Sequence, residues 1–260
     1  DVDGSVTEDM RFALLRKTQE KPDDVMFAEL LVWFALQMKD YEIALNQEIA
    51  IDRRLNDREY DIIYLARIAR DNEQYDIAIN AYDYLIKKSK EGAFYPEAVV
   101  GLTEVEYINS EYDNSEFEKR IENECQELGI NDMTIPILII RTDILAFRLK
   151  ETEKAIELLN NTLELNISRL NKAKLKMKLA DIYLFNEEVW EATLLYSQVD
   201  KSMKEEPIGH EARFKNAQLR YYIGEFDWAL SVLNILKSAT SKLIANDAMT
   251  LSLVITDNLE

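Results

Sequence analysis

Few residues of this chain could carry out chemistry. The sequence holds one histidine, His210, and one cysteine, Cys125, so a nucleophile with an activating base has almost no candidates. It has no glycine-rich phosphate loop and no His or Cys pair at metal-ligand spacing. We expect His210 to be a solvated surface residue and Cys125, set among glutamates that disfavour its thiolate, to be a packing residue. No catalytic, cofactor or metal site is predicted.

Paired carboxylates are the remaining catalytic arrangement. Glu104 with Glu106, or Asp23 with Asp24, could act as the acid and base of glycoside hydrolysis. Only 3 Trp are available as sugar platforms, and the predicted loops are too short to build a cleft. We therefore predict that the chain is not an enzyme and keep a helical-toroid glycoside hydrolase as a remote alternative.

Composition limits both the fold and the partners. With 6 Gly and 4 Pro in 260 residues, the chain has too few breakers for a strand-rich or loop-rich fold. Its 31 Lys and Arg stand against 49 Asp and Glu, and this net charge of −18 disfavours binding to nucleic acid or anionic membranes. The chain has no apolar run of about 20 residues and no basic-then-apolar leader, so we expect no membrane insertion and leave bacterial cytoplasm and periplasm open.

A short motif recurs along the chain and indicates how its elements are organised. Asp-Tyr-Glu-Ile-Ala, ending at Ala44, returns as Gln-Tyr-Asp-Ile-Ala, ending at Ala78, 34 residues later. Related segments end at Ala155, Ala192 and Ala229. Such a period predicts hairpins of two helices, in which small side chains let the two axes approach to about 8 to 10 Å.

Each motif alanine is expected to contact small residues of the preceding helix. The expected partners are Val32 and Ala35 for Ala44, Ala66 and Ala69 for Ala78, Ala180 and Tyr183 for Ala192, and Ala217 for Ala229. Pro22, Pro96, Pro136 and Pro207 fall at expected helix starts, where a missing amide costs nothing. Gly92, Gly129 and Gly224 fall at or just past helix ends, where a left-handed residue is favoured.

This pattern resembles the tetratricopeptide repeat family. The resemblance implies an all-α fold, a right-handed α-α superhelix (solenoid) of about 14 antiparallel helices. We expect a single array over 1–260: a half repeat (5–22), full repeats at 23–56, 57–92, 95–129 (degenerate), 133–167, 168–206 and 207–240, and the first helix of a further repeat (241–257). Both ends look cut from a longer array, so we expect a fragment of a longer bacterial protein.

In such solenoids the first helix of each repeat lies on the concave wall, and one stripe of its side chains faces the hollow. We predict that this stripe forms a partner-binding groove. Its predicted members are Trp33, Tyr60, Tyr64, Arg67, Arg70, Arg141, Phe147, Arg148, Lys174, Lys178, Phe214, Lys215, Tyr221 and Tyr222. The same projection places Ile63, Ile140, Ile144 and Met177 on the stripe. Trp33 could equally pack against the next repeat.

The stripe is richer in Arg and Lys than the chain as a whole, which suggests a protein or peptide partner with acidic and aromatic character. The alternative is that these cations are ordinary solvated or ion-paired side chains. The resemblance implies a non-catalytic scaffold or adaptor for protein binding. A structural subunit, whose groove is filled by another chain of a homo- or hetero-oligomer, is the second hypothesis.

Overall fold

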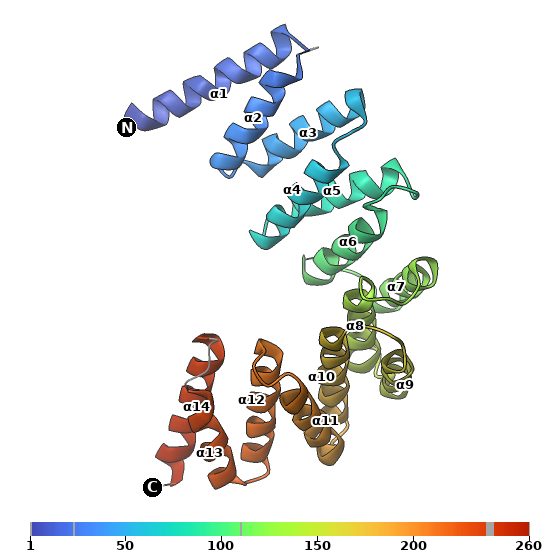
Figure 1. Cartoon of the computed structure of the whole chain (residues 1–260), viewed down its shortest axis with the longest axis vertical. Coiled ribbons are helices and arrows are strands. Elements are labelled where there is room, and N and C mark those ends of the chain that lie inside the picture. Colours follow the sequence, from blue (N-terminus) through green and yellow to red (C-terminus); the bar gives the residue numbers. More distant parts are fainter. Residues whose placement is uncertain (1, 23, 110, 238–241, 260) are drawn as a thin grey trace. The chain divides into compact units, whose positions relative to one another are not determined.

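A computed structural model describes residues 2–22, 24–109, 111–237 and 242–259 of the chain. Over these residues it contains fourteen α-helices, one π-helical segment and no strand (Figure 1). The predicted all-α class is confirmed. Two compact units divide the chain, the first spanning Asp1–Asp113 and the second Asn114–Glu260.

The first unit consists of six helices in antiparallel succession. They are α1 (Val2–Glu20), α2 (Val25–Gln37), α3 (Tyr41–Leu55), α4 (Glu59–Asp71), α5 (Tyr75–Lys88) and α6 (Tyr95–Asn109). The even-numbered helices correspond to the first helices of the predicted repeats.

The second unit holds the other helices. They are α7 (Asn114–Leu128), α8 (Ile135–Asp143) with its π-helical continuation η1 (Ile144–Arg148), α9 (Thr152–Leu163), α10 (Arg169–Phe185), α11 (Val189–Ser202), α12 (Pro207–Tyr222), α13 (Phe226–Leu236) and α14 (Lys242–Leu259). The boundary between the units lies inside the degenerate third repeat, between α6 and α7. The single array and its repeat boundaries stay predictions.

The motif alanines form the helix crossings of both units. Ala44, Ala78, Ala155, Ala192 and Ala229 are all fully buried. Ala44 shares a core cluster with Val32 and Ala35. The other expected sets also share core clusters: Ala78 with Ala66 and Ala69, Ala192 with Ala180 and the partly buried Tyr183, and Ala229 with Ala217. The predicted contacts are therefore confirmed.

Enlarging one of these alanines should disrupt a crossing. We expect Ala78→Leu to lower the free energy of unfolding by about 1 to 3 kcal/mol, because added methyl groups force apart a packed core. Ala50→Leu is the control, since Ala50 is exposed on α3 and has room. Urea denaturation measures both variants. A cost at Ala78 below about 0.5 kcal/mol, within the range of ordinary surface changes, would contradict the assigned packing.

A glycine supplies the close approach between α5 and α6. A Cβ atom at Gly101 would lie 2.4 Å from the ring of Tyr82, a side chain that is itself buried. Only glycine lets the α6 backbone pass this close to the ring. The third predicted repeat lacks the alanine motif, yet its first helix, α6, has a small residue, Gly101, where it crosses α5.

A left-handed residue recurs in the turns, five positions before each motif alanine. These residues are Lys39, Glu73, Lys150, Glu187 and Gly224, with φ between 58° and 84°. In four turns the amide of the following residue donates to a carbonyl five residues back, as Asp40 does to Ala35 at 2.8 Å. This is the Schellman arrangement that ends helices. Sequence reasoning found Gly224 and missed the other four, because they are not glycines; Gly92 is not left-handed.

Glycine should relieve the strain of these turns. We expect Glu187→Gly to raise the free energy of unfolding by about 0.5 to 1 kcal/mol, since a side chain at left-handed φ costs roughly 1 to 2 kcal/mol and glycine's extra backbone entropy offsets part of the gain. The matched control is Glu188→Gly, one residue later at φ −84°, which should destabilise the protein. Thermal unfolding compares them; destabilisation at Glu187 would contradict the strain.

The turn after α8 contains one extra residue. The amide of Glu151 donates to the carbonyl of Leu145, six residues back, at 2.7 Å, and Leu149 donates to Ile144, five back, at 2.9 Å. The π-helical segment absorbs this insertion without ending the helix. Prolines mark other helix starts as predicted, in the first turns of α6, α8 and α12, whereas Pro22 lies ahead of α2.

Candidate binding surfaces on the first helices

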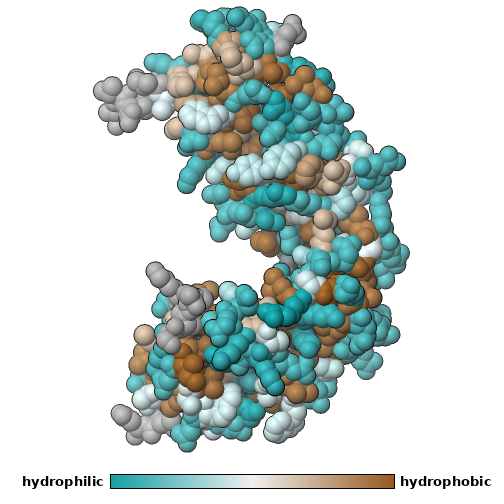
Figure 2. Space-filling view, in the orientation of Figure 1, coloured by the Kyte–Doolittle hydropathy of each residue, from teal (hydrophilic) through white to brown (hydrophobic). Residues whose placement is uncertain are grey.

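Large apolar side chains are exposed on two neighbouring first helices of the first unit. Helix α2 presents Met26, Leu30 and Trp33, the last 57% exposed. Helix α4 presents Tyr60, 61% exposed, and Tyr64. Much of the face drawn in Figure 2 is hydrophilic, with apolar residues gathered in patches. Exposed apolar side chains that share neighbouring helices are a feature of binding surfaces.

The basic residues of this surface are paired with carboxylates of the next first helix. Arg67 of α4 forms two hydrogen bonds with Glu97 of α6, at 2.5 and 2.6 Å. Arg70, also on α4, lies 3.2 Å from Glu104 of α6. The partners are separated by 30 and 34 residues, so each pair joins one repeat to the next. These guanidinium charges are largely balanced within the unit.

Similar pairs occur in the second unit. Lys215 of α12 contacts both carboxylate oxygens of Asp181 on α10, at 2.7 and 2.8 Å. Lys178 of α10 pairs with Asp143 of α8. These contacts again span about one repeat, since the partners are 34 and 35 residues apart.

Arg141 has two carboxylate partners. Its guanidinium binds Glu118 at 2.7 Å and Glu122 at 2.6 Å, both on α7. Burial alone would lower its pKa, but these hydrogen bonds and charges outweigh burial and raise the pKa. Reversing the charge at Arg141 would set three carboxylates side by side, so it is unsuitable as a test of a free basic surface.

Five of the seven basic stripe residues are thus ion-paired. Within the described ranges, the two without an ion pair are Arg148 and Lys174, and both are exposed. Four further stripe positions were assigned wrongly: Ile63, Ile140, Ile144 and Met177 are buried. All four side chains lie in the core, so the exposed stripe is narrower than predicted.

The predicted aromatic residues of the second unit are exposed to different degrees. Tyr222 is well exposed, whereas Phe147, Phe214 and Tyr221 are partly buried. Phe147 contacts the exposed Phe185 edge to face, with ring centroids 5.1 Å apart. Phe214 and Tyr221 pack against the core that contains Ala217 and Ala229. These rings therefore contribute to core packing as well as to the surface.

A hollow of the second unit lies across α10, α12 and α14, whose ribbons stand in one row in Figure 1. It has a volume of about 720 Å³. Its apolar lining residues are Leu170, Pro207, Ile208, Phe214, Leu243 and Ile244. Its polar lining residues are Lys174, Glu206, Glu211, Lys215, Gln218 and Asp247. We call it the α10–α12–α14 groove; three of its members, Lys174, Phe214 and Lys215, were predicted from the sequence.

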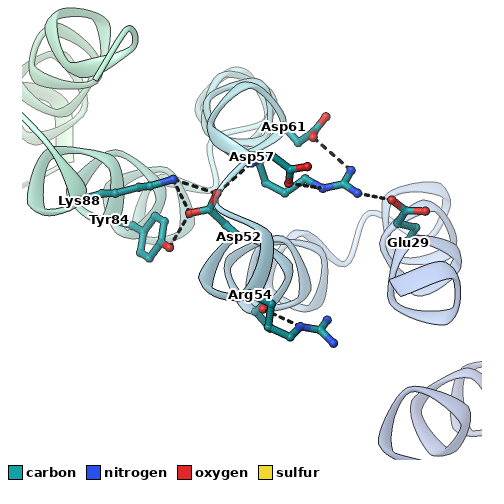
Figure 3. Close-up of polar contacts among 9 residues, drawn as sticks. Glu29, Asp52, Arg54, Asp57, Asp61, Tyr84 and Lys88 are labelled. Atoms are coloured by element: carbon teal, nitrogen blue, oxygen red, sulfur yellow. Dashed lines mark hydrogen bonds and ion pairs between the residues drawn. The ribbon is translucent and has the colours of Figure 1, made fainter. Parts of the chain in front are cut away.

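A network of charged side chains links helices of the first unit (Figure 3). Asp52 of α3 is 2% exposed and accepts hydrogen bonds from Lys88 at 2.7 Å and from the Tyr84 hydroxyl at 2.8 Å. The backbone amide of Arg58 donates to it at 2.9 Å. Burial would raise the pKa of Asp52, but the hydrogen bonds outweigh it and the pKa lies below its usual value. The network ties α3 to α5 and to the start of α4.

Glu48 is a second buried carboxyl on α3. It is 5% exposed, and its Oε2 has no hydrogen-bond partner among the described residues. Burial is the main cause, and repulsion from Asp61 the second, that raises the pKa of Glu48 from 4.5 to about 7. The positive charge of Arg58 lowers this pKa but does not outweigh them. Sequence reasoning did not find this residue, because an acidic side chain on a helix is normally a surface residue.

The residues first considered for catalysis lie apart from any built site. Glu104 and Glu106 are two positions apart on one helix, so their side chains do not face each other. Asp23 lies outside the described residues, which removes the Asp23–Asp24 pair from structural comparison. Cys125 is buried, as predicted for a packing residue, and burial raises its thiol pKa to about 11. His210 is partly buried in the first turn of α12 rather than fully solvated.

In the described part of the chain, histidine, cysteine and acidic residues form no group of three or more that could hold a metal ion. None of its helices combines the length and the apolarity that crossing a bilayer requires.

Comparison with known proteins identifies the fold. The sequence matches no protein-family model and no curated protein. Among solved structures, it is similar to a tetratricopeptide repeat protein from Parabacteroides merdae, with a TM-score of 0.58 and 12% identity over 97% of this chain and 94% of that one. A thermophilic TPR protein of Thermus thermophilus gives 0.57 and 16%, over 76% of this chain and 98% of that one.

Yeast Tom70 is similar at a TM-score of 0.59 and 12% identity, where the match covers 97% of this chain and 59% of Tom70. A Rap protein, solved in complex with competence and sporulation factor, gives 0.53 and 11% over 98% of this chain and 88% of that one. These likenesses establish a helical-repeat fold of the tetratricopeptide type, as predicted from the motif.

Proposed function

We propose that this protein is a non-catalytic scaffold that binds a segment of a partner protein on its first helices. The observation that carries the proposal is the α10–α12–α14 groove, where Leu170 and Leu243 are exposed at 47% and 71% beside partly buried Phe214. A hollow lined by apolar side chains with a few polar groups is typical of ligand sites, and an apolar groove can take the apolar face of an amphipathic peptide. The Rap protein complex is a precedent for ligand binding by this fold.

Two further features support a binding role. Trp33, Tyr60 and Tyr64 give the first unit an aromatic surface on equivalent helices, and aromatic side chains contribute much of the energy of interfaces. The cations beside them are balanced by carboxylates of neighbouring helices. We therefore propose that apolar contact, more than free positive charge, drives binding. The sequence predicts an acidic partner, and this stays a prediction. It has less support than before, because most of the basic stripe residues on which it depends are ion-paired.

A peptide-display selection tests the proposal. A randomised library is selected against the whole chain, and the enriched peptides are then measured against two variants. Leu243→Asp should weaken them about tenfold or more, since it places a charge on the apolar wall of the groove. Leu253→Asp is the matched control on the same helix, where Leu253 is 55% exposed and lies outside the groove.

The result that supports the proposal is loss with Leu243→Asp and retention with Leu253→Asp. Equal loss with both variants, or a library from which no specific peptide emerges, would contradict it. Light scattering over a concentration series addresses the structural-subunit hypothesis. Self-association that Leu243→Asp abolishes would favour a second copy of the chain as the occupant of the groove.

A further inference from the structure

We infer that the segment bound in the α10–α12–α14 groove combines apolar with basic side chains. This inference rests on the proposed function and adds the charge class of the partner. It reverses the expectation drawn from the sequence, in which the cations of the first helices select an acidic partner.

The reversal follows from a count of the charges that line the groove. Three exposed carboxylates, Glu206, Glu211 and Asp247, form no ion pair within the described ranges. Lys215 is balanced by Asp181, which contacts its ammonium at 2.7 Å. Lys174 is the remaining lining cation, so one cation stands against three carboxylates and the groove is negatively charged.

The carboxylates are also placed where they could form ion pairs with a bound segment. Glu206 directly precedes α12, Glu211 lies on its first turns and Asp247 on α14, so negative charge comes from two elements of the groove. The apolar lining includes Leu170 on α10 and Leu243 on α14. A segment whose apolar side chains contact this lining would bring neighbouring Lys or Arg within reach of the carboxylates. Complementary charges of this kind set specificity more than affinity.

Three synthetic amphipathic peptides of equal length test the inference. They share a leucine face and carry Lys, Gln or Glu on the other face, and binding is measured by fluorescence anisotropy at low and high salt. We expect the Lys peptide to bind about tenfold more tightly than the Glu peptide at low salt, and this preference to shrink as salt screens the carboxylates.

The chain has a net charge of −18, which alone could attract the Lys peptide to any part of its surface. A pair of double variants separates this general attraction from the groove. Glu211→Lys with Asp247→Lys reverses two groove charges. Glu191→Lys with Asp227→Lys reverses two exposed charges on α11 and α13, outside the groove. Both change the net charge by +4, from −18 to −14.

The inference predicts that the groove variant binds the Lys peptide about tenfold more weakly, whereas the control variant stays within about twofold of the unchanged protein. Circular dichroism verifies that both remain folded. Equal weakening by the two variants, or equal binding of the three peptides, would overturn the charge class and leave the proposed apolar groove standing. If none of the three peptides binds and the library selection also fails, both the charge class and the proposed groove would be contradicted.

Discussion

Replacing Asp52 by alanine is expected to lower the free energy of unfolding by about 3 kcal/mol at pH 7. Removing one partner of a buried ion pair strands the other charge away from water, a loss of roughly 3 to 5 kcal/mol. Lys88 would keep Glu59, 3.1 Å away, which places the expected cost at the lower end of that range. The Tyr84 hydroxyl and the Arg58 amide would lose an acceptor as well.

A matched control is available on α5. Asp83 pairs with Lys87 one turn away; the Lys87 side chain is exposed and that of Asp83 is partly exposed. Surface pairs of this type contribute roughly 0.2 to 1 kcal/mol, so Asp83→Ala should have a small effect. Asp52→Asn keeps the size of the side chain and isolates the charge. Equal costs at Asp52 and Asp83 in urea denaturation would contradict the network.

The pH dependence of Asp52 has a definite sign. Because its pKa is lowered on folding, its contribution is present above its unfolded pKa of 3.8 and is lost as pH falls through the folded pKa. The difference between the unchanged protein and Asp52→Ala should therefore shrink in acid.

Glu48→Gln is expected to stabilise the protein at pH 8. The folded pKa of about 7 lies above the unfolded 4.5, so folding takes up a proton between these values. Stability from the protonated carboxyl is full below pH 4.5 and is lost as pH rises to about 7. With one pKa unit equal to about 1.4 kcal/mol, the cost of the buried charge at pH 8 is at most about 3.5 kcal/mol, and Gln should remove most of it.

Chemical denaturation at pH 5 and pH 8 measures this effect. The gain from Glu48→Gln should be largest at pH 8 and small at pH 5, where Glu48 is already neutral in the folded state. Glu42→Gln, on an exposed position of the same helix, should show no such difference. A gain that does not depend on pH would mean that the hydrogen bonding of the amide, and not the charge, is responsible.

The helix crossings could be predicted from the sequence because they depend on local information. A recurring motif, spaced 34 residues apart in its first two copies, fixes which alanines face the preceding helix, and Ala44 and Ala78 lie where this spacing places them. The helices follow from the same signal together with the positions of Pro and Gly. A repeated pattern averages out the ambiguity of any single segment.

The charges of the binding surface could not be predicted in the same way. Whether Arg67 is free depends on Glu97, 30 residues away, and on the stacking of two hairpins. Counting charges along one stripe omits the carboxylates that the next helix brings to it. The burial of Glu48 and Asp52 and the left-handed turns at Lys39 and Glu187 also depend on three-dimensional context, because their residue types indicate ordinary surface positions.

The most direct test of the binding role locates the bound peptide on the chain. A peptide from the library selection is given a photoreactive group, crosslinked to the whole protein, and the linked residues are identified by mass spectrometry. We predict crosslinks at 170–174 of α10, 206–218 around α12 and 243–247 of α14, the segments that line the groove. Crosslinks concentrated on α11 and α13, or spread evenly over the chain, would contradict the account.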